Sequence, residues 1–407
     1  MRAFRHLLVS TATSNLADGL LKVGAPLLAV TMTRSPTLVS LVGMATTLPW
    51  LLLALHAGAI ADRGDRRRIM MAAGLVRTAT LGAATVLALC GWLSLPLLVA
   101  AVLLAGVSEV FADTSAQAVL PMTVPRERLT HANGQVVGVQ TIGNDFVGAP
   151  LAGLLVALVP VAVIGAPALL YGLAALALVG MRGTYRPENP STGPLRRDIA
   201  SGLRYLREHR FLRTLAISAG LLNFANAAYF AVFILWAVGA GSRIGMEPAA
   251  YGLVMTTLAV GALVGSQVAS RVAAALGDGR TLAAVWTLSS LLLLVPVLYP
   301  TPWALYVTGA LLGVTGAAGN VIVISMRQRI IPEELLGRVN SAYRLIGMGG
   351  SPLGALAGGL VGEAYGLPAV FVSAVVVCLI AVALISPRLI SRPLTCTTVV
   401  SGISGSR

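Results

Sequence analysis

Charged residues are scarce in this chain of 407 residues, because Asp, Glu, Lys and Arg together make up only 11% of it. Soluble domains carry roughly a quarter charged residues, so the composition excludes an ordinary soluble enzyme. The hydrophobic share of 57% excludes a disordered or collagen-like chain. Aromatic residues are also few, at 5%. The three cysteines, Cys90, Cys378 and Cys396, form neither a disulfide framework nor a Cys-x-x-Cys metal pair.

The hydrophobic residues lie in long runs that fit membrane helices. About twelve helices of roughly 20 residues would use some 240 residues, close to the apolar content of the chain. We therefore predict an all-α polytopic membrane protein with twelve transmembrane helices. Their expected positions are 7–31, 37–61, 69–92, 95–120, 131–157, 160–181, 214–239, 249–274, 280–299, 303–325, 339–362 and 367–387.

The basic residues give a formal net charge of +14, and only Lys22 among them is a lysine. They form short clusters between the apolar runs rather than one patch, so the charge does not indicate a nucleic-acid partner. With a cytoplasmic N-terminus, 24 arginines fall in cytoplasmic segments and only Arg34 and Arg243 fall outside. The positive-inside rule therefore places both termini in the cytoplasm. The first apolar run, of about 24 residues, is too long for the core of a signal peptide.

One long polar stretch divides the predicted helices into six and six. We expect an N-terminal bundle at 1–181, a cytoplasmic central loop at 182–213, a C-terminal bundle at 214–387 and a cytoplasmic tail at 388–407. The second half of the loop predicts a short helix on the inner leaflet, and the alternative is a solvated tether.

The two halves share weak sequence echoes. Asn133 follows Pro125 by eight residues, and Asn340 follows Pro332 by the same spacing. A Gly-x-Pro step then follows in each half. Parallel repeats of this kind predict two six-helix bundles that face a central cavity.

The loop between the second and third predicted helices has a specific pattern of small and charged residues. Gly58 permits close approach of helices. Asp62, at a helix end, can accept hydrogen bonds from a neighbouring helix or pair with an arginine, and Arg63, Arg66 and Arg67 can bind anionic headgroups. We predict a conformational latch, and the alternative is a plain positively charged loop.

Besides Arg77, five charged residues lie inside the predicted helices of the N-terminal half. Charges in hydrocarbon are costly and tend to face a cavity or a partner. Asp18 and Lys22 have the (i, i+4) spacing of an ion pair, and this pair has a structural clasp as its alternative role. Glu109 is the first candidate for a proton carrier, because no basic residue lies one turn away on its helix. Asp18 and Asp145 are further candidates, whereas Asp113 is expected to serve structure or a gate.

Uncharged polar residues in the helices could line the cavity or bond helices to one another. These candidates are Asn15, Asn144, Asn223, Asn226, Tyr229 and Asn320. Arg77 and Arg344 are expected to reach the inner interface or to counter the acidic residues. The four histidines are scattered, and the chain has no HExxH, P-loop or GxSxG motif. We therefore predict no enzyme activity, no cofactor and no metal site, and a transport process driven by an ion gradient.

The loop from Gly58 to Arg68 resembles the signature of the major facilitator superfamily, usually Gly-x-x-x-Asp-Arg-x-Gly-Arg-Arg. It departs from that signature at Gly64-Asp65. A second-half signature is similar to the branch that contains the enterobactin exporter and macrolide efflux proteins. Its residues include Arg327, Gln328, Pro332, Gly337, Arg338, Asn340 and Arg344. This resemblance implies a secondary transporter of two six-helix bundles, in a bacterial inner membrane, that exports a small molecule by alternating access.

A pattern in the fifth predicted helix, Gly143, Gly148, Pro150 and Gly153, resembles the antiporter motif of the same superfamily in imperfect form. Small residues and a proline permit tight packing and a bend. In the family this element accompanies efflux.

The expected function is export of a drug, siderophore or natural product in exchange for protons. The expected partners are that substrate, protons and membrane lipids, and the expected oligomeric state is a monomer. An uptake symporter and a lipid flippase on the same fold are the alternatives. A membrane-embedded enzyme is disfavoured, because the sequence has no nucleophile–base or metal constellation.

Overall fold

The computed structural model describes residues 2–186 and 195–390. The N-terminal half contains α1 (Arg2–Met32), α2 (Pro36–Ala61), α3 (Arg66–Leu89), α4 (Leu95–Val119), the 3₁₀ turns η1 (Leu120–Met122) and η2 (Arg126–Arg128), α5 (Leu129–Thr141), the π-helical segment η3 (Ile142–Gly148), α6 (Ala149–Leu158) and α7 (Ala162–Val179). The C-terminal half contains α8 (Leu195–Glu208), α9 (Arg210–Ala237), α10 (Pro248–Leu276), α11 (Asp278–Leu292), α12 (Val295–Leu298), α13 (Pro302–Ile330), α14 (Glu333–Tyr365) and α15 (Leu367–Ile390).

Eleven segments of the described residues are long and apolar enough to cross a membrane. The 31-residue helix α1 packs among them and is the twelfth, and polar and charged residues interrupt its apolar run. These residues include Ser10, Thr11, Ser14, Asn15, Asp18 and Lys22. The prediction of a twelve-helix membrane protein is confirmed.

Local sequence signals explain where several helices begin. The Ser35 side chain accepts a hydrogen bond from the Leu38 amide at the start of α2, and Pro36 follows it in the first turn. Asp65 caps α3 through the amides of Arg67 and Arg68. Such caps satisfy amide groups that have no partner inside the helix.

The fifth membrane segment is not a uniform helix, because η3 interrupts it between α5 and α6. A π-helical turn holds one more residue than an α-helical turn and is frequent at functional sites. This segment contains Asn144 and Asp145, and it packs against α1.

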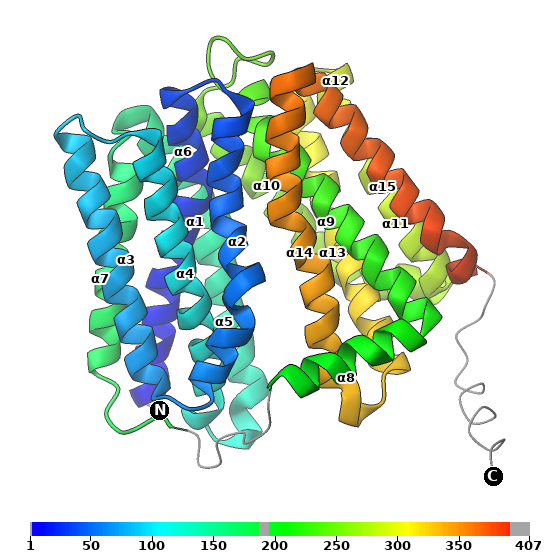
Figure 1. Cartoon of the computed structure of the whole chain (residues 1–407), viewed down its shortest axis with the longest axis horizontal. Helices are drawn as coiled ribbons and strands as arrows, with labels where there is room; N and C mark the ends of the chain where they lie inside the picture. The colour runs from blue at the N-terminus through cyan, green and yellow to red at the C-terminus, as the bar shows by residue number, and fades with distance from the viewer. Residues whose placement is uncertain (1, 187–194, 391–407) are drawn as a thin grey trace.

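The helices form two bundles (Figure 1). In the first, α1 packs against α7, α2 against α4, and α3 against both α4 and α7. In the second, α9 packs against α14 and α15, and α13 packs against α10 and α11. The bundles meet mainly through α2 with α14 and through α6 with α10. Helix α8 lies across the end of the second bundle and packs against α14.

The molecule has an arginine-rich end and an opposite end. The arginine-rich end holds the N-terminus, the loop 62–65 and α8, at the bottom of Figure 1. The opposite end holds the loops 33–35 and 238–247, at the top. The bundles lie close together at the opposite end and diverge toward the arginine-rich end (Figure 1). Of the predicted cytoplasmic segments, residues 187–194 of the central loop and 391–407 of the tail lie outside the described residues.

Candidate functional site: a buried ionic cluster beside a central cavity

Arg77 on α3 is the centre of a cluster of charged side chains inside the N-terminal bundle. Its side chain is 1% exposed. Its Nη1 atom lies 3.3 Å from Oδ1 of Asp18 on α1, and Nη1 also donates to Oγ of Ser14 at 3.2 Å. The hydroxyl of Tyr171 on α7 donates to the same Asp18 oxygen at 2.6 Å, and the Arg77 guanidinium lies 4.5 Å from the centre of the Tyr171 ring. Side chains of α3 and α7 therefore bind the Asp18 carboxylate of α1.

Glu109 on α4 is the second acidic residue of the cluster. Its Oε2 lies 3.8 Å from Nη2 of Arg77, and this Nη2 makes no hydrogen bond within the described structure. Nε of Arg77 donates to the Ala105 carbonyl, one turn before Glu109, at 3.3 Å. The Glu109 side chain is 31% exposed, against 11% for Asp18. Glu109 is thus the looser and more accessible of the two carboxylates.

Asp113 lies one turn beyond Glu109 on α4, as its spacing predicts. It lines a small cavity toward the arginine-rich end, together with Arg77, Ser14, Asn15 and other residues of α1, α3, α5 and α7. One arginine therefore lies among three carboxylates.

The sequence predicts an ion pair between Asp18 and Lys22, and this expectation is wrong for the structure. No ion pair between them occurs among the described residues; Asp18 pairs with Arg77 instead. The (i, i+4) spacing puts the two residues on one helix face, but a cation from another helix fills the position beside Asp18. The alternative that Arg77 counters the acidic residues is the one that the structure supports. Sequence reasoning missed Tyr171, whose signal was a tyrosine inside an otherwise apolar helix.

A central cavity of about 380 Å³ lies between the two bundles. Lys22 and Asp145 line it from the N-terminal half, and Phe230, Tyr251 and Met255 line it from the C-terminal half. Lys22 is exposed there, so it faces a cavity and does not pair with Asp18. The remaining lining residues are Gly19, Val23, Pro26, Val39, Gly43, Thr47, Asn144, Ala149, Ala227, Ala231, Ile234, Leu258, Ser351 and Ala355.

A hydrogen bond joins the central cavity to the ionic cluster. Nδ2 of Asn144 donates to Oδ1 of Asn15 at 2.9 Å. Asn144 lines the central cavity, and Asn15 lines the small cavity beside Arg77 and Asp113. The π-helical segment η3 and helix α1 are therefore coupled at this point.

The opposite end is closed by contacts between the bundles. Nη1 of Arg34 donates to the Val238 carbonyl at 2.9 Å, and Oγ of Ser35 donates to Oε2 of Glu363 at 2.6 Å. Thr37 donates to the Gly359 carbonyl at 3.3 Å. These hydrogen bonds join the two halves at this end of the molecule.

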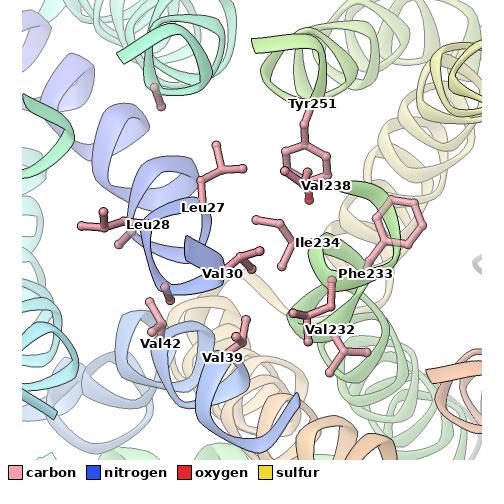
Figure 2. Packing of buried hydrophobic residues seen from close by; sticks show 14 of the residues in the cluster. Leu27, Leu28, Val30, Val39, Val42, Val232, Phe233, Ile234, Val238 and Tyr251 are labelled. Atoms are coloured by element: carbon pink, nitrogen blue, oxygen red, sulfur yellow. The ribbon is translucent and has the colours of Figure 1, made fainter. Parts of the chain in front are cut away.

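Apolar side chains complete this closure. Figure 2 shows Leu27 and Val30 of α1 and Val39 of α2 on one side, facing Ile234 and Val238 on the other. These residues are buried. The central cavity is therefore sealed on the side of the opposite end by packed aliphatic groups.

The loop 58–68 is bonded within its own bundle. Oδ1 of Asp62 lies 3.7 Å from Nη2 of Arg66. Arg66 donates to the carbonyls of Ala61 and Ala118, Arg67 donates to those of Leu178 and Val179, and Arg63 is exposed. Apart from its own helix, no described residue has a heavy atom within 4 Å of the position that a Cβ on Gly58 would take. The close helix approach that the sequence predicts at Gly58 is absent from this conformation.

The glycines of the fifth membrane segment lie at close contacts. A Cβ on Gly148 would lie 2.8 Å from Cα of Gly19 on α1, so only glycine fits there. Gly143 packs against the α1 backbone near Asn15 in the same way. Gly153 packs against Pro248 and Ala249 of α10, and Gly252 of α10 packs against Ala149 and Pro150. The first part of the antiporter-like pattern thus packs against α1 of its own bundle, and the second part lies where α6 meets α10 of the other bundle.

The second-half signature lies at the arginine-rich end of α13 and α14. Arg327 stacks on the ring of Tyr343 with 4.0 Å between the guanidinium carbon and the ring centre. Oδ1 of Asn340 is buried and has no hydrogen-bond partner in the described structure. Gly337 lies within α14. The exposed members are Gln328, Pro332, Arg338 and Arg344.

Comparisons with known proteins agree with this architecture. The model of the transmembrane secretion effector family matches residues 1–395. The multidrug efflux pump Tap of Mycolicibacterium fortuitum is 28% identical over 381 residues, which cover 90% of this chain and 91% of Tap. The enterobactin exporter EntS of Shigella dysenteriae serotype 1 (strain Sd197) is 30% identical over 372 residues, which cover 88% of this chain and 85% of EntS.

Solved structures show the same fold. The nucleoside transporter NupG superposes with a TM-score of 0.72 at 14% identity, covering 97% of this chain and 100% of that chain. A bacterial homologue of the iron transporter ferroportin, in an inward-facing state, gives 0.74 at 17% identity and covers 96% and 99%. The chain belongs to the transmembrane secretion effector family of the major facilitator superfamily, whose members are membrane transporters and not enzymes.

Proposed function

We propose that this transporter exports a small organic molecule by alternating access, in exchange for protons. Tap and EntS, named as an efflux pump and an exporter, support the direction of transport. In this proposal the protein lies in the bacterial inner membrane as a monomer. The arginine-rich end and both termini face the cytoplasm, because 24 arginines are then inside.

The observation that carries the proposal is the sharing of one arginine by several carboxylates. Arg77 bonds Asp18 closely and Glu109 loosely, and Asp113 lines the same small cavity. One positive charge cannot neutralise three negative charges in a low-dielectric interior, where unpaired charges are costly. A proton on Glu109 relieves this excess, and its release restores it. Glu109 is therefore the first proton carrier, with Asp18 and Asp145 as further members of the pathway.

Proton and substrate sites are linked through helix α1 and η3. Asn144 and Asp145 are adjacent in η3 and line the central cavity, and Asn144 is bonded to Asn15 beside the cluster. A change in the charge of Glu109 alters the forces on Arg77 and, through Asp18, on α1, which also carries Lys22. This connection lets protonation bias the shape of the central cavity.

In the proposed transport cycle this conformation is the inward-open state. The bundles, near 1–181 and 214–387, are bonded at the opposite end and diverge at the arginine-rich end. In the outward-open state the loop 58–68 closes the cytoplasmic side, with Gly58 at a helix contact and Asp62 at a helix end. The arginines of this loop also bind anionic lipids.

The test is accumulation of a panel of fluorescent and macrolide compounds in cells that lack their own efflux pumps. Cells that express the wild type are compared with cells that express Glu109→Gln, with and without a protonophore. The matched control is Glu127→Gln, because Glu127 lies in the exposed turn η2 and contributes no side chain to either cavity.

Reduced accumulation that the protonophore reverses, and that Glu109→Gln lacks while Glu127→Gln keeps, supports proton-coupled export. Increased accumulation would instead establish an uptake symporter. No effect on any compound, together with transbilayer movement of labelled lipid in proteoliposomes, would establish a flippase.

A further inference from the structure

A second cavity, of about 400 Å³, lies inside the C-terminal half. It is bounded by α9, α10, α11, α13, α14 and α15, and none of the predicted proton-coupling residues lines it. Among the described residues, its polar lining consists of asparagine, serine, tyrosine and one arginine, with no acidic side chain. These residues are Asn223, Asn226, Ser289, Ser290, Asn320, Arg327 and Tyr343.

Arg327 is the cation of this cavity. Its guanidinium stacks on the Tyr343 ring, which fixes its plane. Its Nε and Nη1 atoms are buried and have no hydrogen-bond partner in the described structure. None of the ion pairs between described residues includes Arg327. Arg77, in the other half, has Asp18 and Glu109 beside it.

Buried donors without partners carry a free-energy cost, and the cost is larger for a charged group. A guanidinium presents parallel N–H groups that match the two oxygens of a carboxylate, phosphate or sulfonate. A bound molecule with an anionic group would supply the hydrogen-bond acceptor that Arg327 lacks. We propose that the C-terminal cavity binds the anionic group of the transported molecule through Arg327. The transported molecules are therefore amphipathic organic anions.

The cavity adjoins the central one. Phe230 and Leu258 line both. An anion on Arg327 would therefore extend its apolar body past Phe230 into the mostly apolar central cavity. Lys22 lies on the far wall of that cavity and adds a second cation. Trp286 lines the C-terminal cavity itself, so its fluorescence reports on occupancy.

This inference rests on the proposed function, because it names the substrate of the same transport pathway. Its test measures binding alone. The full chain, purified in dodecyl maltoside, is titrated with 1-anilinonaphthalene-8-sulfonate, an amphipathic anion that accepts energy from tryptophan. N-phenyl-1-naphthylamine, which has the same rings and no sulfonate, is titrated in parallel.

Four variants define the site. Arg327→Gln removes the cation, and Arg327→Lys keeps the charge without the planar fork. Arg280→Gln is the matched control, because Arg280 is an exposed arginine of the same half that lines neither cavity. Trp286→Phe removes the nearby donor of energy transfer.

We expect Arg327→Gln to weaken sulfonate binding about tenfold or more, as the loss of charge-assisted hydrogen bonds requires. Arg327→Lys should fall between that variant and the wild type, and Arg280→Gln should match the wild type. Binding of the uncharged amine should stay constant in all of them. Trp286→Phe should lose most of the energy transfer.

Equal sulfonate affinity in the wild type and Arg327→Gln would overturn the proposal, and so would a parallel loss of both probes. Displacement of the sulfonate by phosphatidylglycerol but not by 2-naphthalenesulfonate would also overturn it, because the anion would then be a lipid headgroup. The proposed function stands or falls separately, since proton-driven export in cells depends on Glu109 and this binding assay uses no proton gradient.

Discussion

The guanidinium of Arg77 on α3 and the carboxylate of Asp18 on α1 form the most buried ion pair of the described residues, with 3.3 Å between Nη1 and Oδ1. Tyr171 on α7 donates to the same carboxylate. Charged side chains inside a membrane are stable only when they are paired or face water. Together with Tyr171, this pair therefore joins three helices. It also holds the Arg77 guanidinium close to a second carboxylate, that of Glu109.

Removal of the cation should destabilise the N-terminal bundle. Arg77→Gln leaves Asp18 and Glu109 without their partner, and loss of one member of a buried pair costs about 3–5 kcal/mol. Asp18→Asn in the same chain should recover part of this loss, because it removes one unpaired charge. Unfolding of the detergent-solubilised protein, followed by tryptophan fluorescence, measures both effects. The control is Arg68→Gln, since Arg68 is 78% exposed and its pair with Asp65 is worth about 1 kcal/mol or less. Equal stability of Arg77→Gln and Arg68→Gln would contradict the structural role of the pair.

Substitution of Gly58 separates stability from transport. Gly58→Ala has open space in this conformation, so the unfolding temperature should not change. Transport should nevertheless fall several-fold, because the latch needs a close helix contact in the other conformation. Asp62→Asn should also impair transport and leave membrane insertion intact. Gly82→Ala on α3 also meets open space and serves as the control. Normal turnover in both Gly58→Ala and Asp62→Asn would rule out the latch.

The closed opposite end can be tested by cross-linking. Ser35 and Glu363 are hydrogen-bonded across the two halves, so cysteines at these positions should react together with a short bifunctional thiol reagent. In a background without Cys90, Cys378 and Cys396, the cross-linked protein should lose nearly all transport, because the end can no longer open. Single-cysteine variants treated in the same way are the controls. Full transport by the cross-linked protein would show that this end need not open.

His209, which lies just outside the membrane segments, should make the stability of the protein depend on pH. Nδ1 of His209 accepts a hydrogen bond from the Leu212 amide and so caps α9, and burial lowers the pKa of its imidazole below the ordinary value. Because the folded state favours the neutral ring, this contribution is present above the unfolded pKa, near 6.5. It is lost as the pH falls through the lower folded pKa. The loss should reach about 1 kcal/mol, the usual worth of such a cap.

Thermal unfolding of the wild type and His209→Asn between pH 5 and pH 8 provides the measurement. Asparagine keeps a capping acceptor that does not titrate, so the variant should lose this part of the pH dependence. Identical pH profiles for the two proteins would refute the assignment to His209.

Contacts between side chains of different helices could not be predicted from local sequence patterns. The spacing of Asp18 and Lys22 predicts that they pair, yet the partner of Asp18 is Arg77, which lies 59 positions further along the chain. Glu109 has no basic neighbour on its own helix, but the structure brings Arg77 to it from another helix. Neighbours on one helix can be read from sequence, whereas neighbours across helices depend on how the helices pack.

The sequence by itself determined the membrane fold of this protein, because long apolar runs must satisfy their backbone groups as helices in a bilayer. It also determined the family, because the Gly58–Arg68 loop and the stretch from Arg327 onward are continuous motifs. Only the tertiary structure decided which charges are paired: Arg77 has two carboxylates beside it, and buried nitrogens of Arg327 have no partner among the described residues. The physical reason is that the electrostatic energy of a buried charge depends on side chains that other helices bring within a few ångströms.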